Sequence, residues 1–133
     1  MNRYHKDGTV PDNMDDIFVF GSNLAGIHGA GAAKIAKDHF GAPFGAGYGL
    51  MGRAYAIPTK DKHVETIELP KIYNYVKHFV YFTYLFPEYS FFVTRIGCGL
   101  AGYSDYHIAP MFIGARNCSF AESWKPYLEM ESL

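Results

Sequence analysis

This chain has few cysteines and almost no net charge. The 133 residues include two cysteines, Cys98 and Cys118, whose spacing fits neither a zinc site nor a disulfide framework. The formal net charge of −1 provides no basic surface that could hold a nucleic acid. We therefore expect no bound metal, no cofactor and no nucleic-acid partner.

Long hydrophobic runs are also missing. Residues 1–16 are polar and lack the apolar centre of a secretion signal. The most apolar stretch, residues 76–86, includes Lys77 and His78 and stops at Pro87, so it is too short to cross a bilayer. The expectation is a cytoplasmic protein with no membrane partner.

Apolar runs alternate with helical patterns along the chain. We expect strands at 17–20, 53–58 and 90–96, and helices at 30–39, 70–85 and within 104–117. This alternation predicts a three-layer α/β/α fold with a mostly parallel central sheet. The length fits a single compact domain of residues 1–133, with a core at about 15–118 and a tail at 119–133 packed on it.

Three glycine-rich loops, at residues 26–31, 45–52 and 97–102, lie at the ends of expected strands or just before one. Ligands of open α/β sheets bind at the carboxyl ends of the strands, and glycine lets the backbone approach them closely. The loop at 26–31 precedes a helix, so its amides are the best candidates to bind a phosphate. We expect Gly31→Glu to abolish such binding and to leave the fold intact.

Neither common nucleotide-binding fingerprint is present. The glycine spacing at 26–31 differs from that of dinucleotide-binding loops, and no acidic residue follows at the next strand end. The Gly-Lys-Ser/Thr sequence of nucleoside-triphosphatases is also absent. ATP and GTP chemistry of the standard kinds is therefore disfavoured.

The glycine loops carry a resemblance to a known family. The relevant segments are 20–24 with 28–33, 45–50 with 55–58, and Arg95-Ile96-Gly97-Cys98-Gly99-Leu100-Ala101-Gly102. Together they resemble the macro domain family, most closely the branch that includes terminal ADP-ribose–protein glycohydrolases. They are also similar to small, mostly phage-associated macro-domain-like proteins. The resemblance runs from about Ile17 to Ala115.

The resemblance implies a macro-type fold without its usual outer strands, and a pocket for ADP-ribose or a related adenine-nucleotide metabolite. An ADP-ribosylated protein is a further implied partner. Asn23 would bind the distal ribose, and Asp16 or Asp15 the adenine amine. The remaining implied ligand-binding residues are Ser22, Gly29, Ala30, Gly31, Gly97, Cys98, Gly99, Leu100, Ala101, Gly102 and Tyr103.

The resemblance also raises the question of catalysis. Lys60 occupies the position of the glycohydrolase lysine, but Ala101 stands where that branch has its acid, and Asp105 is the nearest alternative. His28 could act as the acid–base of a phosphatase-type macro domain. We therefore expect hydrolysis of an ADP-ribosyl linkage or a terminal phosphate. The alternative is a non-catalytic reader or sponge of ADP-ribose or NAD-derived signals.

Two further residues are candidates for a role near the third glycine loop. Cys98, between two glycines, is either a small packing residue or a nucleophile with a lowered pKa. Arg95 is expected to pair with a carboxylate or a carbonyl rather than with a ligand. A structural protein with a vestigial pocket is a third functional class, but the glycines in all three loops argue against it.

Overall fold

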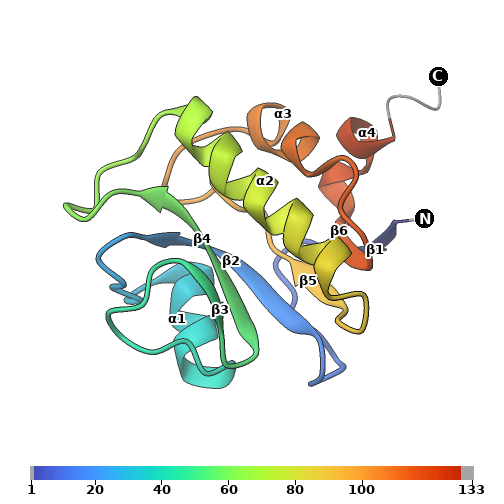
Figure 1. The fold of residues 1–133 in the computed structure, drawn as a ribbon. Coiled ribbons are helices and arrows are strands. Elements are labelled where there is room, and N and C mark those ends of the chain that lie inside the picture. Colours follow the sequence, from blue (N-terminus) through green and yellow to red (C-terminus); the bar gives the residue numbers. More distant parts are fainter. Residues whose placement is uncertain (1, 130–133) are drawn as a thin grey trace.

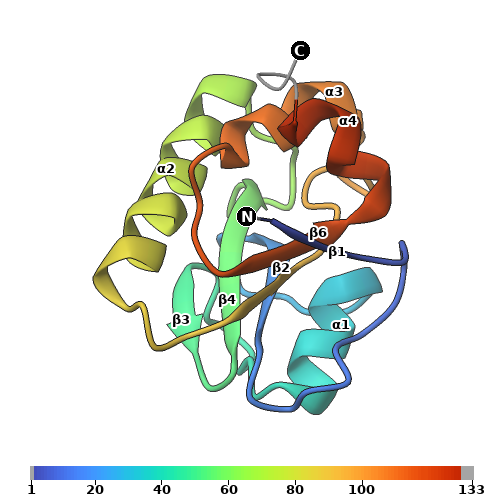
Figure 2. The same cartoon turned by 90° about the vertical axis from the view of Figure 1, so that its right-hand side faces the viewer.

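The computed structural model describes residues 2–129, which form one sheet covered by helices on both faces (Figures 1 and 2). The strands are β1 (Arg3–His5), β2 (Ile17–Asn23), β3 (Gly49–Met51), β4 (Ala54–Lys60), β5 (Phe91–Val93) and β6 (Cys118–Ala121). The α-helices are α1 (Gly31–His39), α2 (Leu69–Leu85), α3 (Asp105–Ile108) and α4 (Lys125–Leu128). Two 3-10 helices are η1 (Ala109–Phe112) and η2 (Glu122–Trp124).

The strand order across the sheet is β1-β6-β5-β2-β4-β3. All neighbouring strands pair in parallel except β3, which runs antiparallel to β4. Helix α1 covers one face, whereas α2, α3 and α4 cover the other (Figure 2). The prediction of a single compact α/β domain with a mostly parallel sheet is confirmed. None of the helices within residues 2–129 is long and apolar enough to cross a membrane.

Strand β2 is buried on both faces, as its uninterrupted apolar sequence predicts. Side chains alternate across a strand, so Ile17 and Val19 enter the larger hydrophobic core beneath α2. Phe18 and Phe20 enter the smaller core beneath α1, where Phe18 stacks on Phe40. One strand therefore joins the two cores.

Three strands were not predicted from the sequence. Strands β1 and β3 have three residues each, and β6 has four, which is too short for a period-2 pattern to stand out. Strand β6 lies between β1 and β5, so the segment expected to be a tail contributes an inner strand of the sheet. Residues 119–121 of the expected tail therefore belong to the sheet, and residues 130–133 lie outside the described part of the chain.

Other expected elements differ in extent. Strand β5 ends at Val93 rather than Ile96, because the Ile96 amide donates to the Thr94 carbonyl in a tight turn (2.8 Å). The single helix expected within 104–117 is divided into α3 and η1, and Pro110 lies in the first turn of η1.

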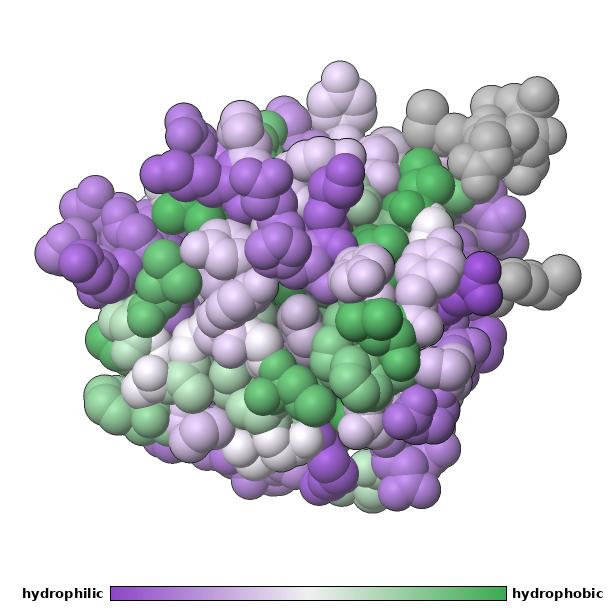
Figure 3. Space-filling view, viewed as in Figure 1, coloured by the Kyte–Doolittle hydropathy of each residue, from purple (hydrophilic) through white to green (hydrophobic). Residues whose placement is uncertain are grey.

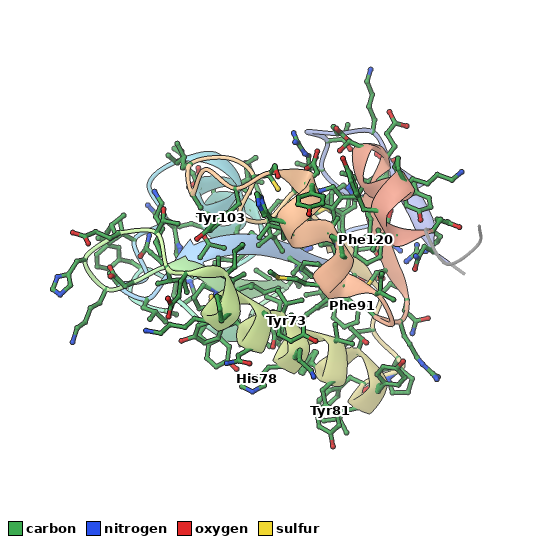
Figure 4. The ribbon with its side chains drawn as sticks, turned by 90° about the horizontal axis from the view of Figure 1, so that it is seen from above. Tyr73, His78, Tyr81, Phe91, Tyr103 and Phe120 are labelled. Atoms are coloured by element: carbon green, nitrogen blue, oxygen red, sulfur yellow. The ribbon has the colours of Figure 1, made fainter. Side chains whose placement is uncertain are left out.

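The outer surface of α2 is rich in aromatic side chains. Among the aromatic residues at 73–86, Phe79 alone is fully buried. Tyr73 and Tyr81 are exposed along the helix, and so is His78 (Figure 4). The face that carries α2 and β3 accordingly mixes weakly hydrophilic and hydrophobic residues (Figure 3).

The inner position of β6 can be tested by core truncation. Phe120 on β6 is fully buried in the larger core. We expect Phe120→Ala to lower the free energy of unfolding by about 3–5 kcal/mol, because it leaves a cavity that the sheet cannot fill. Urea denaturation measures this loss. Tyr106→Ala, at a side chain that is 67% exposed, is the control and should change stability by less than about 0.5 kcal/mol. A loss below about 1 kcal/mol for Phe120→Ala would contradict the placement of β6.

Candidate ligand-binding site

A cavity of about 580 Å³ opens at the carboxyl ends of β2 and β4 and is lined by the first and third glycine loops. This volume is typical of small-molecule sites. Of the residues that the sequence singled out, the cavity is lined by Ser22, Asn23, Gly29, Ala30, Gly31, Lys60, Gly97, Cys98, Gly99, Leu100 and Ala101. The structure therefore brings most of the candidate residues together.

Six of the candidate residues do not line this cavity. They are Asp15, Asp16, His28, Gly102, Tyr103 and Asp105. Asp16 precedes β2 at the opposite end from the cavity and lines a second hollow of about 450 Å³. Tyr103 is half-buried, and its hydroxyl donates to the Ile67 carbonyl (2.8 Å). Asp16 and Tyr103 are thus not placed to contact a ligand in the main cavity.

Asn23 shapes the first glycine loop with its own side chain. Its Nδ2 donates to the Ile27 carbonyl (2.8 Å), and its Oδ1 accepts from the Ile27 amide (2.9 Å). Its backbone carbonyl also accepts from the Gly26 amide (3.0 Å). The Ile27 bonds occupy the side-chain oxygen of Asn23 and one of its two Nδ2 hydrogens. The other Nδ2 hydrogen is left for the ribose contact that the resemblance implies.

The second glycine loop supports the first and does not line the cavity. The Ser22 hydroxyl donates to the Gly47 carbonyl, and the Gly45 amide donates to the Gly26 carbonyl (2.8 Å). A Cβ on Gly47 would lie 2.1 Å from the Asn23 carbonyl oxygen, so no other residue fits there. The glycines of this loop therefore allow two backbones to pack together.

His28 also holds the first and second glycine loops together. Its ring is 2% exposed and packs edge-on against Phe20. Its Nε2 donates to the Ala46 carbonyl (2.9 Å), and its Nδ1 has no partner among residues 2–129. The structure thus places the proposed acid–base outside the cavity, where it joins the two loops.

Two segments that line the cavity carry backbone amides without acceptors among the described residues. The first-turn amides of α1, from Gly31 to Ala33, have no acceptor among the described residues, and the N-cap Ala30 has no capping side chain. In the third loop the amides of Gly99, Leu100 and Ala101 also lack an acceptor within residues 2–129. Uncapped helix amides carry partial positive charge and bind anions.

The charged side chains of the cavity have one sign. Lys60 and Arg95 line it, whereas no Asp or Glu of the described chain does. Arg95 donates from Nε and Nη2 to the two oxygens of Asp105, both at 2.9 Å, which confirms the expected pairing with a carboxylate. The positive charge at the cavity, together with the free amides, favours an anionic ligand.

Asp105 is held in this pair and lies outside the cavity. Its Oδ1 also accepts from the indole Nε1 of the buried Trp124 (2.8 Å). Burial alone would raise the pKa of Asp105, but the hydrogen bonds from Arg95 and Trp124 outweigh it and hold that pKa below its usual value. The carboxylate is therefore ionised and engaged, which does not suit an acid that protonates a leaving group.

Several cavity residues had no signal in the sequence. His5, Gly8 and Thr9 line the cavity from the N-terminal segment. The His5 ring stacks on Phe92 with centroids 3.7 Å apart and hydrogen-bonds the Ser119 hydroxyl. Burial lowers the pKa of His5 to about 4, so its ring is neutral at pH 7. This position of His5 depends on the pairing of β1 with β6, which the local sequence does not indicate.

Cys98 lines the cavity as a protonated thiol. Burial, together with the nearby Asp105 carboxylate, raises its pKa to about 12. A thiol with this pKa is a poor nucleophile at neutral pH. The structure therefore favours the packing role of Cys98 over the nucleophilic role.

The thiol pKa predicts slow alkylation. In a Cys118→Ser background, we expect iodoacetamide at pH 8 to label Cys98 in the folded protein at least about a hundredfold more slowly than in urea. Mass spectrometry over time measures both rates. Equal rates in the two states would mean that the fold does not raise the pKa of Cys98, and faster labelling of the folded protein would indicate an activated thiolate.

Comparison with known proteins identifies no relative. No protein-family model, no curated protein and no solved structure matches the chain significantly.

Proposed function

We propose that this chain binds ADP-ribose or a related adenine-nucleotide metabolite, and that the ligand diphosphate lies between the first turn of α1 and the third glycine loop. The observation that carries the proposal is the set of amides without acceptors on these two loops, in a cavity that no carboxylate of residues 2–129 lines. Backbone amides at a helix N-terminus suit a diphosphate better than a neutral ligand.

The macro-type fold is part of the same proposal. A mostly parallel sheet lies between two helical layers, and both Asn23 and the segment 97–101 line the cavity. These features support the resemblance of the sequence to macro domains. A reader or sponge of ADP-ribose, free or attached to a protein, follows as the first functional class.

Hydrolysis of an ADP-ribosyl linkage is the second candidate function, and Lys60 is the residue that favours it. Lys60 ends β4 beside Asn23 and lines the cavity, and no carboxylate within residues 2–129 pairs with its amine. An amine so placed could attack an anomeric carbon. The departing group would need a proton, but Asp105 and His28 lie outside the cavity and Ala101 has no acid. Binding without turnover is therefore the better-supported function.

Calorimetric titration with ADP-ribose, with AMP as comparator, tests the proposal. Gly31 has φ 58°, so Gly31→Glu would strain the backbone in addition to weakening ligand binding. Ala32 also lines the cavity and does not have a positive φ, so a substitution there tests binding alone. We expect Ala32→Glu to weaken ADP-ribose binding at least a hundredfold, because its carboxylate competes for the α1 amides. The same change should leave the free energy of unfolding equal or higher by about 0.3–1 kcal/mol.

Ala32→Gln is the matched control, with nearly the same shape and no charge. It should bind ADP-ribose within about threefold of wild type, a difference of about 0.65 kcal/mol. Equal affinity of the Glu and Gln variants would show that the α1 amides do not hold the phosphates.

Turnover is measured separately, with ADP-ribosylated protein as substrate and Lys60→Ala as the variant. We expect wild type and Lys60→Ala to release ADP-ribose at the same background rate, because no acid lines the cavity among the described residues. Release that depends on Lys60, in a variant that still binds ADP-ribose, would establish the hydrolase instead.

A further inference from the structure

Exposed apolar side chains stand at one side of the cavity. Val64 is 40% exposed and Leu100 is 74% exposed, and both belong to the lining. Val64 follows β4, and Leu100 is in the third glycine loop. Neither side chain is needed to bind a phosphate, and both leave apolar surface in water.

The backbone of Val64 is held in an unfavourable conformation. Its φ is 63°, which is a genuine outlier for a β-branched residue. The Asp61 carboxylate accepts from the amides of His63 (2.8 Å) and Glu65 (3.1 Å), and the Val64 amide donates to the Asp61 carbonyl (3.0 Å). Residues held in this way are often found where a ligand is gripped.

The segment that carries Val64 is joined to the third glycine loop. The Thr66 hydroxyl donates to the Ala101 carbonyl (3.1 Å), and the Tyr103 hydroxyl from the other side donates to the Ile67 carbonyl (2.8 Å). Val64 and Leu100 are therefore held on linked segments at the same side of the cavity.

An aromatic ring of the protein lies at the other side of the cavity. The neutral His5 ring, stacked on Phe92, lines the cavity from β1. Strand β1 is four positions away from β4 in the sheet, a separation of about 19 Å at about 4.8 Å per strand. The free amides of α1 and the third loop also line this cavity. The cavity therefore has apolar or aromatic side chains on both sides of the free amides.

On the basis of the function proposed above, we propose that Val64 and Leu100 form an apolar clamp for a second, uncharged ring of the ligand. The preferred ligand class is then a dinucleotide whose diphosphate joins two ring-bearing nucleosides, rather than ADP-ribose with its terminal sugar. Reduced nicotinamide adenine dinucleotide, NADH, is the probe of this class.

The test is calorimetric titration of wild type and variants with NADH and with ADP-ribose. We expect wild type to bind NADH at least fivefold more tightly than ADP-ribose. Val64→Asn should remove most of this preference and change ADP-ribose affinity by less than twofold. Because asparagine tolerates positive φ, Val64→Asn should melt at an equal or higher temperature than wild type. If Val64 affected binding only by stabilising the fold, the variant would melt at a lower temperature instead.

Two further variants separate the explanations. Leu100→Asn should also lose the preference for NADH. Ile113→Asn, at an apolar residue 43% exposed and outside the cavity lining, should keep it. If ADP-ribose binds but NADH binds no more tightly, or Val64→Asn keeps the preference, the clamp is wrong and the proposed function stands. If neither ligand binds, the proposed function and the clamp are both wrong.

Discussion

The burial of β2 on both faces is the constraint on which the rest of the structure depends. Its alternating side chains enter the two cores, so the strand holds α1 on one side of the sheet and α2 on the other. Its last residues, Ser22 and Asn23, then emerge at the cavity with their backbone direction already determined. A polar substitution within Ile17–Phe20 would disturb one of the two cores and, through the shared strand, the site.

The site is built largely from backbone. Its glycines permit close packing between the first and second loops, and its amides supply the positive partial charge. Side chains that could transfer protons are instead engaged elsewhere: His28 joins two loops, and Asp105 holds Arg95. Such an arrangement favours recognition of an anion over chemistry on it.

The C-terminal segment lines the cavity at Ala121, and it also positions other residues of the site. Trp124 donates to Asp105, and Asp105 orients Arg95, which lines the cavity. Strand β6, which precedes Trp124, pairs with β1 and so buries His5 against Phe92. The ends of the chain thus position both a cation and an aromatic ring at the cavity.

Local sequence determined the elements with a strong pattern of their own: the apolar strand β2, the long helix α2, and the glycine loops whose amides need no side chain to act. Only the tertiary structure decided the positions of β1, β3 and β6, because strands of three or four residues form through pairing with distant partners rather than through local periodicity. For the same reason the sequence could not show that His5 lines the cavity, or that His28 and Asp105 lie outside it. Their hydrogen-bond partners, Ser119, Ala46 and Arg95, become neighbours only when separate strands and loops meet.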